Sequence, residues 1–265
     1  MLIFAFSSQK LVPITHFNVL ANVVQLTLYE AKGRGKPSYR DVLLGALPLS
    51  HIYGVVVISH LSMYRGDSII VLPRFDMEQV LSCTQKFRIN TLCLVPPIIV
   101  NMIKQPDLLA RYDLTSVTTV ISGAGPLGPE TVKGLAKYYP TWVLRQAYGL
   151  TESAACICHT SAHDPWIGSS GSILPGVQVK LLDQNGDEIT ACDKPGELLC
   201  KSPSIVSGYL HNETATQETF MNAEDGHWLR TGDVGLFSKA PSGNEHVLIV
   251  DRVKDLIKVK VAPIP

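Results

Sequence analysis

Residues 146–152 read Gln146-Ala147-Tyr148-Gly149-Leu150-Thr151-Glu152, and the rest of the chain is organised around them. Tyr148 offers a flat face for a purine, and Gly149 lets the backbone turn and approach a ligand closely. Thr151 can donate to a phosphate oxygen, and Glu152 is a hard oxygen ligand for Mg²⁺. A strand end followed by a helix cap explains the same residues without any ligand. The stretch alone leaves both interpretations open.

The composition is that of a folded protein without a bulk charge. Of the 265 residues, 46% are hydrophobic and 17% are charged. A chain of this size can bury roughly seven tenths of its extended surface. Lys+Arg and Asp+Glu each number 23, so no overall field attracts nucleic acid or an anionic membrane. We therefore expect no nucleic-acid partner, and any polyanion must be bound by a local site.

The six cysteines are scattered and show no zinc or disulfide spacing. They lie in apolar runs such as Thr91-Leu92-Cys93-Leu94-Val95, which is typical of reduced core thiols in an intracellular protein. Cys156 and Cys158 form the close pair C-x-C, for which a metal role is disfavoured.

We predict neither a targeting segment nor a membrane span. Residues 1–6 are apolar but lack a basic start and an A-x-A-like site, so a buried strand is the better interpretation. Residues 42–64 are apolar enough to suggest a membrane span, yet they contain Pro48, His51, Gly54 and His60. A strand, a functional turn and a buried helix explain that run better. The final Pro-Ile-Pro is neither a lipidation nor a peroxisomal signal.

Up to about residue 147, predicted strands alternate with predicted helices. The strands are residues 2–6, 42–48, 68–72, 91–95, 117–122 and 143–147, and the helices are residues 16–30, 55–64, 77–87, 97–104 and 129–139. Such alternation predicts right-handed βαβ units and a parallel sheet with helices on both faces. The stretch 146–152 then lies at the carboxyl end of a strand, where open α/β sheets bind ligands.

After about Ile167 the pattern changes to short β-like runs. These runs are residues 177–182, 197–201, 228–237 and 246–250, with a turn at 183–186 and a short helix at 212–220. Such runs are typical of antiparallel hairpins and predict a small β subdomain beside the sheet. We therefore divide the chain into an α/β portion (1–166), a β-rich portion (167–251) and residues 252–265.

Three further stretches are candidate ligand contacts. Ser122-Gly123-Ala124-Gly125-Pro126 lies between a strand and a helix, where small residues admit a flat ring, although in isolation an ordinary tight turn is the favoured interpretation. Asp233 could accept both hydroxyls of a ribose, although without context a Gly-Asp hairpin turn is the favoured interpretation. The charged run at 251–260 contains three lysines, and a solvated charged face is the alternative there.

Six segments resemble, in order, the core motifs of the adenylate-forming superfamily, which includes acyl- and aryl-CoA synthetases, luciferases and peptide-synthetase adenylation domains. They are PLSHIYG (48–54), SGAGPLG (122–128), QAYGLTE (146–152), GELLCKSPSIVSGY (196–209), WLRTGD (228–233) and DRVKDLIKVK (251–260). The first and last are most similar to the coumarate-CoA ligase and luciferase-like branch, including its fungal acyl-CoA ligases. One such motif can arise by chance, whereas six in order identify the chain as a member.

The resemblance implies an α/β fold, part of the large domain of adenylate-forming enzymes. That part contains a parallel sheet with flanking helices and a small β-barrel-like subdomain, and residues 252–265 would be a hinge remnant. The implied activity is that of an acid-CoA ligase: a carboxylate attacks the α-phosphorus of ATP, pyrophosphate leaves, and coenzyme A opens the acyl-adenylate. Metal and cations are needed because negative charge grows on the phosphate oxygens. The implied cofactors are ATP or AMP, Mg²⁺ and coenzyme A, and full-length relatives are cytoplasmic or peroxisomal.

The resemblance also implies roles for individual residues. Gly123, Ala124 and Tyr148 would hold adenine, Asp233 and Arg252 the ribose, and Lys10, Gln146 and Gly149 would complete the nucleotide site. Thr151 would contact an AMP phosphate oxygen, and Glu152 would hold Mg²⁺. His51, Tyr53, Gly125 and Ala147 would border the acyl pocket, with His51 as its gate. Lys254 would be the hinge, Lys258 a catalytic contact in one domain orientation, and Arg74 and Lys260 contacts for coenzyme A.

The sequence departs from the family where the phosphate loop is expected. Relatives have a Ser/Thr/Gly-rich run ending in Pro-Lys-Gly, which cradles the β- and γ-phosphates. Here residues 6–12 read Phe-Ser-Ser-Gln-Lys-Leu-Val, so the glycine-threonine centre is absent. We therefore interpret the chain as an excerpt of a ligase, without the half that precedes the loop and without the mobile C-terminal domain. Such an excerpt should leave an apolar face uncovered and self-associate.

Two alternatives to the ligase remain. The chain could be an inactive, truncated paralogue that at most binds AMP or an acid. It could also be an adenylation module that loads a carrier protein, although the run at 251–260 argues weakly against that branch. The residues do not reveal which acid is used, because the pocket selects by shape.

Overall fold

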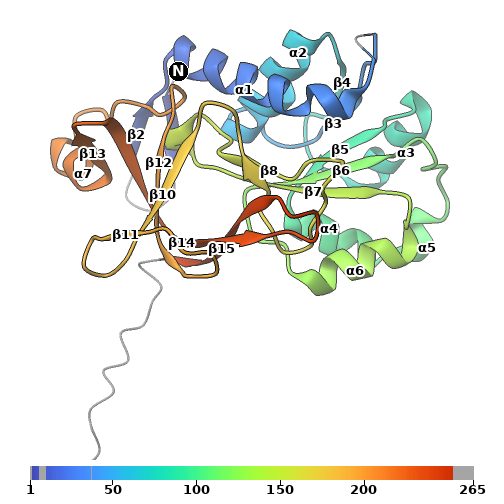
Figure 1. The fold of residues 1–265 in the computed structure, drawn as a ribbon. Coiled ribbons are helices and arrows are strands. Elements are labelled where there is room, and N and C mark those ends of the chain that lie inside the picture. The colour runs from blue at the N-terminus through green and yellow to red at the C-terminus, as the bar shows by residue number, and fades with distance from the viewer. Residues whose placement is uncertain (1, 6–9, 37, 253–265) are drawn as a thin grey trace, which may run out of the picture.

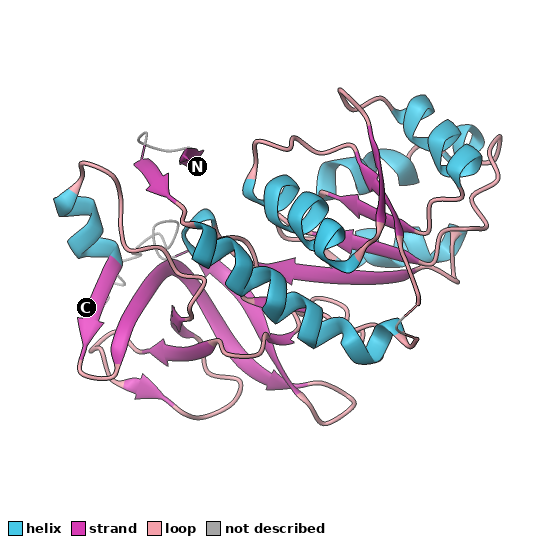
Figure 2. Cartoon of the chain, turned by 90° about the horizontal axis from the view of Figure 1, so that it is seen from above, coloured by secondary structure: helices cyan, strands magenta, loops and turns pink. Residues whose placement is uncertain are grey.

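A seven-stranded mixed sheet, whose parallel strands lie on the right in Figure 1, forms one half of the molecule (Figure 1, Figure 2). The computed structural model describes residues 2–5, 10–36 and 38–252. The strand order is β4-β3-β5-β6-β7-β8-β9, in which the pairs from β4 to β7 are parallel and β8 and β9 are antiparallel additions. The strands are β3 (Val42–Gly45), β4 (Ser68–Val71), β5 (Thr91–Leu94), β6 (Thr119–Ser122), β7 (Val143–Tyr148), β8 (Cys158–His159) and β9 (Ser172–Ile173).

The parallel register brings the carboxyl ends of three strands close together. Leu94 of β5 pairs with Ser122 of β6, and Ser122 pairs with Gln146 of β7. The turns that follow β6 and β7 therefore leave the sheet at the same edge, which is where ligands of open α/β sheets bind.

Helices cover both faces of this sheet, which confirms the predicted α/β class. In Figure 1, α1 and α2 lie above the sheet, and α4, α5 and α6 lie below it. The helices are α1 (His16–Arg34), η1 (Tyr53–Leu61), α2 (Ser62–Arg65), α3 (Met77–Phe87), α4 (Pro96–Ile103), α5 (Pro106–Leu109) and α6 (Pro129–Tyr138). Within the described part of the chain, no helix is both long and apolar enough to cross a membrane.

The segment after Pro48 differs from the predicted helix. Residues Tyr53–Leu61 form a π-helix, a wider form that usually occurs in single turns and often at functional sites, and it continues as α2. A Cβ on Gly54 would lie 2.2 Å from the carbonyl oxygen of Pro48. The start of η1 therefore packs directly against the turn after β3, and only glycine allows that contact.

The amino-terminal strands form a separate hairpin. β1 (Leu2–Ala5) pairs antiparallel with β2 (Lys10–Pro13) in a two-stranded sheet. The prediction that residues 2–6 belong to the βαβ series is therefore wrong, because the strand pairs locally. Phe6 lies outside the described residues.

A second, antiparallel sheet of six strands contains most of the remaining chain. Its order is β11-β10-β12-β14-β13, with β15 also paired to β14. The elements are β10 (Gln178–Leu182), β11 (Glu188–Ile189), β12 (Gly196–Lys201), α7 (Glu213–Thr219), β13 (Phe220–Ala223), β14 (Gly226–Lys239) and β15 (Glu245–Arg252). The sheet is open along its described length, so the barrel-like closure is not confirmed. The turn at 183–186 joins β10 to β11, and β12 pairs with β10 as well.

Two hydrophobic cores meet at η1. Val55 and Val56 belong to the core that α1 shares with the second sheet, whereas Tyr53 and Ile58 belong to the core of the parallel sheet. Four cysteines, at 93, 156, 158 and 200, are buried free thiols. The prediction of core thiols is wrong for Cys192, which is exposed, and Cys83 is half-buried.

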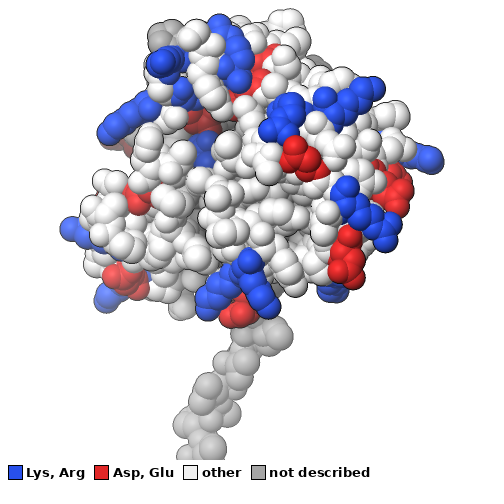
Figure 3. Space-filling view, turned by 90° about the vertical axis from the view of Figure 1, so that its right-hand side faces the viewer, with Lys and Arg blue, Asp and Glu red and all other residues white. Residues whose placement is uncertain are grey.

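The surface reflects the balanced charge of the chain. On the face shown in Figure 3, Lys and Arg side chains are interspersed with Asp and Glu, and uncharged areas lie between them. This face carries no extended patch of one sign.

Candidate functional site

The turn after β7 is set by Gly149. A Cβ at this position would lie 1.6 Å from the carbonyl oxygen of Ala155, so the two backbones are in direct contact. Ala154 and Ala155 have φ angles of 51° and 115°, which are costly for residues with a side chain. Residues Thr151–Ser153 form a short 3₁₀ turn rather than the start of an α-helix. Backbone strain of this kind concentrates at functional sites.

Tyr148 and Asp233, which lie 85 residues apart, meet at this edge. The Tyr148 hydroxyl donates to Asp233 Oδ2 at 2.6 Å, and Arg252 Nε donates to Asp233 Oδ1 at 3.1 Å. Burial, reinforced by the Asp233 carboxylate, raises the pKa of Tyr148 well above its ordinary value. Asp233 is 4% exposed and lies where β14 departs from regular pairing with β12, between Arg230 and Val234. Such bulges commonly aim a side chain at a site.

Glu152 lies beside a second tyrosine. Its Oε1 accepts a hydrogen bond from the Tyr209 hydroxyl at 2.7 Å, and burial raises the pKa of Tyr209. Lys10 Nζ lies 4.5 Å from the centre of the Tyr209 ring. Lys10 and Glu152, both predicted for the nucleotide site, therefore contact the same aromatic side chain, Lys10 at its ring and Glu152 at its hydroxyl. Sequence reasoning missed Tyr209, although it ends one of the six motifs.

The residues around Glu152 suit a metal ion that is held partly by the phosphates of a bound nucleotide. Among the described residues, no group of three His, Cys, Asp or Glu side chains could hold an ion alone. Mg²⁺ typically binds one or two carboxylates together with substrate phosphates. A single carboxylate at Glu152 fits that pattern. No hydrogen bond within the described chain uses the hydroxyl of neighbouring Thr151.

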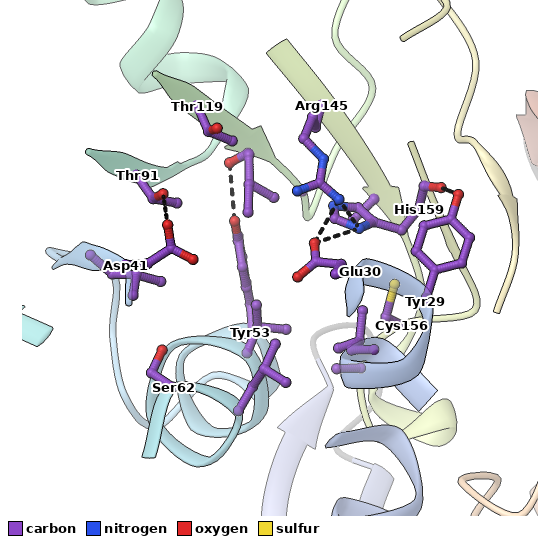
Figure 4. A pocket seen from close by; sticks show the side chains of 18 of the residues that line it. Tyr29, Glu30, Asp41, Tyr53, Ser62, Thr91, Thr119, Arg145, Cys156 and His159 are labelled. Carbon is purple, nitrogen blue, oxygen red and sulfur yellow. Dashed lines mark hydrogen bonds and ion pairs between the residues drawn. The ribbon is translucent and has the colours of Figure 1, made fainter. Parts of the chain in front are cut away.

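A cavity of about 290 Å³ opens beside this edge, between α1, η1 and the strands β5 to β7 (Figure 4). Of the predicted site residues, its lining contains His51, Tyr53, Gly123, Ala124, Ala147, Tyr148 and Gly149. Predicted Gly125 and Gln146 are not part of the lining. The cavity thus brings most of the predicted adenine and acyl contacts onto one surface.

Tyr53 crosses the cavity. Its hydroxyl donates to the carbonyl oxygen of Ile121 at 3.0 Å, and its ring lies 3.3 Å from where a Cβ on Gly123 would be. In Figure 4 its side chain stands between Asp41 on one side and Glu30 on the other. His51 Nδ1 accepts from the Tyr53 amide at 3.2 Å, and burial lowers the pKa of His51. Ala124, in the turn after β6, has a φ of 64° and is exposed.

Sequence reasoning missed a buried ionic cluster in the cavity wall. Glu30 of α1 accepts hydrogen bonds from Arg65 at 2.5 Å and from Arg145 Nη2 at 2.6 Å, and His159 Nδ1 lies 3.2 Å from it. All four side chains are at least 90% buried. The one available signal was the arginine immediately before Gln146 in a buried strand, since lone charges there need partners.

A second ionic group lines the same cavity. Arg34 at the end of α1 forms ion pairs with Asp41 and with Asp67, and Asp41 Oδ1 also accepts from Thr91 at 3.1 Å. Burial and the neighbouring Asp41 raise the pKa of Tyr39 to about 12. This group lies at the amino ends of the parallel strands, opposite the edge that carries Tyr148.

The remaining predicted residues lie elsewhere. Lys254, Lys258 and Lys260 are outside the described residues. Arg74 is exposed in the loop after β4 and is not part of the cavity lining. Their roles remain predictions.

Comparisons with known proteins agree with this geometry. A model of the AMP-binding enzyme family matches residues 7–210. The acyl-CoA ligase easD of Emericella nidulans is 41% identical over 252 residues, which cover 95% of this chain and 44% of that protein. The acyl-CoA ligase gloD of Glarea lozoyensis is 43% identical over 256 residues, which cover 97% of this chain and 44% of that protein. The chain therefore spans less than half the length of these relatives.

Solved structures share the fold. ATP-bound MatB from Rhodopseudomonas palustris superposes with a TM-score of 0.81 at 26% identity, over 97% of this chain and 48% of that one. A long-chain-fatty-acid-CoA ligase from Archaeoglobus fulgidus superposes with a TM-score of 0.83 at 24% identity, over 95% of this chain and 51% of that one, which supports the fold alone. Since the family model covers most of the sequence, the chain belongs to the AMP-binding enzyme family.

Proposed function

We propose that the chain serves the ATP-dependent ligation of a carboxylic acid to coenzyme A. The observation that supports this most strongly is that one cavity would serve both ligands, because Gly123 and Tyr148, which suit a nucleotide, and His51 and Tyr53, which suit an acid, share its walls. An acid lying in that cavity would present its carboxylate to the nucleotide at the carboxyl edge of the sheet. The curated relatives bear the name acyl-CoA ligase.

Each residue of the nucleotide site then has a physical task. Tyr148 and the Gly123-Ala124 turn would flank adenine, and Asp233 would accept the ribose hydroxyls with its remaining lone pairs. Thr151 would donate to an α-phosphate oxygen and orient the phosphorus for attack. Magnesium, held by Glu152 and phosphate oxygens, would neutralise charge that develops on the phosphate.

The part of the cavity that would bind the acid acts through charge as well as shape. The lowered pKa of His51 keeps its imidazole neutral at pH 7, so His51 would line the entrance without pairing with the acid carboxylate. The carboxylate would therefore stay available as the nucleophile. We further propose Arg74 and Lys260 as contacts for coenzyme A.

Nucleotide binding tests this proposal directly. By calorimetry, we expect AMP to bind the chain more tightly than ATP, because residues 6–12 lack the glycine-rich centre that cradles the β- and γ-phosphates. Asp233→Asn should weaken AMP binding by roughly tenfold or more, because an acceptor for a hydroxyl is lost. Asp187→Asn, at an exposed position in the turn between β10 and β11, is the control and should bind normally. Equal affinities for AMP and ATP, or an unchanged affinity for AMP in Asp233→Asn, would contradict the assignment.

A turnover assay separates the ligase from the alternatives. Purified protein would be incubated with ATP, Mg²⁺, coenzyme A and a panel of cinnamic and fatty acids, and AMP release would be measured. We expect slow, acid-dependent release that coenzyme A accelerates. AMP binding without any release would favour the inactive paralogue instead, and release that coenzyme A leaves unchanged would favour carrier loading.

A further inference from the structure

Within the described part of the chain, Arg145 of β7 has one terminal nitrogen without a hydrogen-bond partner. Its Nε donates to the carbonyl oxygen of Thr160 at 2.8 Å, and its Nη2 contacts Glu30 Oε1 at 2.6 Å and His159 Nδ1 at 3.0 Å. No hydrogen bond within the described residues uses Nη1. The dashed lines in Figure 4 likewise reach a single terminal nitrogen of this side chain.

The unused nitrogen is accessible from the cavity. Among the described residues, the enclosed side-chain nitrogens and oxygens without a partner are Ser122 Oγ and His159 Nε2, and Arg145 Nη1 is not one of them. Arg145 lines the cavity although its side chain is only 10% exposed. Its small exposed area therefore includes Nη1, which offers a donor to whatever fills the cavity.

The cluster around Arg145 carries an excess positive charge. Burial alone would raise the pKa of Glu30, but Arg145, His159 and Arg65 together hold it well below its ordinary value, so Glu30 is an anion. Burial and the neighbouring Arg145 lower the pKa of His159 to about 4, so its imidazole is neutral at pH 7. Two guanidinium groups therefore face one carboxylate, and this cluster has a charge of +1. The Arg34–Asp41–Asp67 group in the same cavity has a charge of −1 and lies at the amino ends of the strands.

Building on the proposed function, we infer that the substrate is an elongated acid whose far end bears a hydrogen-bond-accepting oxygen, and that Arg145 Nη1 binds this oxygen. Arg145 and Gly149 are four residues apart along β7 and its end, which corresponds to roughly 13 Å of extended chain. The reactive carboxylate would lie near Gly149, and the distal oxygen near Arg145. A second carboxylate would match the charge of the Arg145 cluster best, on the side of Tyr53 that faces Glu30 and not Asp41 (Figure 4). A plain alkyl end would leave Nη1 without a partner in a desolvated place.

A matched pair of acids tests this inference. Calorimetry would measure the binding of decanedioic acid and decanoic acid to the whole chain at pH 7 in the presence of AMP. We expect the diacid to bind roughly tenfold more tightly or better, because hydrogen bonds to charged groups are among the stronger ones. In Arg145→Met that preference should disappear while decanoic acid still binds.

Arg65→Lys is the control for a merely structural role. Arg65 contacts the same Glu30, but its three nitrogens all have protein partners, at Thr27, Glu30 and Leu26. This variant should therefore keep the preference for the diacid. If Arg145→Met does not fold, Arg145→Lys provides the measurement, because its single ammonium is held by Glu30 and should also lose the preference.

The outcomes separate the two proposals. Equal binding of the two acids to the original chain, or a preference that survives in Arg145→Met, would overturn the role of Arg145 and leave the acid site intact. If Arg65→Lys loses the preference for the diacid as fully as Arg145→Met does, the role of Arg145 is also overturned, because Arg145 would then act only through the cluster. If neither acid binds, the acid site itself fails, and this inference fails with it.

Discussion

The backbone of Gly149 touches that of Ala155, and this contact sets the turn that carries Thr151 and Glu152. A methyl group there would sit 1.6 Å from a carbonyl oxygen, so the backbone would have to move. We expect Gly149→Ala to lower the free energy of unfolding by about 1–3 kcal/mol and to abolish AMP binding. Thermal unfolding and calorimetry measure the two effects. Gly128→Ala, with no atom within 4 Å of the added Cβ, should keep AMP binding and cost less stability, because it changes only the N-cap residue of α6.

His159 makes stability depend on pH. In the unfolded chain it protonates near its ordinary pKa of 6.5, whereas in the folded chain burial and Arg145 keep it neutral down to about pH 4. The unfolded state therefore binds more protons in this range, and the free energy of unfolding should fall from pH 6.5 to 4, by about 3 kcal/mol at most. Urea unfolding at several pH values should show that the free energy of unfolding depends less steeply on pH in His159→Gln than in the original chain. His163→Gln, at an exposed position, should leave this pH dependence unchanged. An unchanged slope in His159→Gln would contradict this account.

Glu30 acts in the same direction at lower pH. Its folded pKa is depressed well below 4.5, so its stabilising effect is full above that value and is lost as the pH falls toward the folded value. The two groups together predict acid sensitivity that begins below about pH 6.5.

The candidate site was partly predictable at the level of residues. Tyr148, Thr151, Glu152 and Asp233 could be proposed because each belongs to a short motif, although the approach of Tyr148 to Asp233 required the fold. Glu30 could not, since a glutamate near the end of a predicted helix is usually a solvated charge. It meets Arg145 115 residues later only because of how α1 packs on the sheet.

Among the elements, α1 depends on its first residue. Thr15 Oγ1 accepts from the Asn18 amide at 3.1 Å, and Asn18 Oδ1 accepts from the Thr15 amide at 3.1 Å, which closes a capping box. We expect Thr15→Ala to lower the free energy of unfolding by about 1 kcal/mol. Thr15→Ser keeps the hydroxyl and should lose much less. Chemical denaturation would measure both, and equal losses would show that the cap contributes little.

The elements were predictable to different degrees. α3 spans the predicted residues 77–87, and β5 and β6 were found because buried parallel strands are largely continuous apolar runs. The short strands β8, β9 and β11 were missed, because two-residue strands exist only through their pairing partners. The π-helical form of η1 was also missed, since its apolar residues suit any buried helix.

At the scale of the whole molecule, α1 presents an apolar stripe to solvent. Phe17, Leu20 and Leu28 are 67%, 56% and 61% exposed, and Val24 lies between them. Contiguous exposed apolar surface favours association. We expect sedimentation at micromolar concentration to show self-association that Leu20→Glu reduces. Ile167→Glu, at an exposed apolar position outside α1, should leave it unchanged. A clean monomer with sharp cooperative unfolding would argue against this prediction.

The long strand β14 has one more consequence. It hydrogen-bonds to β12, β13 and β15 along its length, and it carries Asp233. Its amide protons can be released to solvent only when several strands separate, so in deuterium-exchange mass spectrometry this strand should be among the last parts of the chain to label. A nucleotide bound at Asp233 would then be held by the slowest-opening part of the molecule, and its protective effect should spread to β12 and β15.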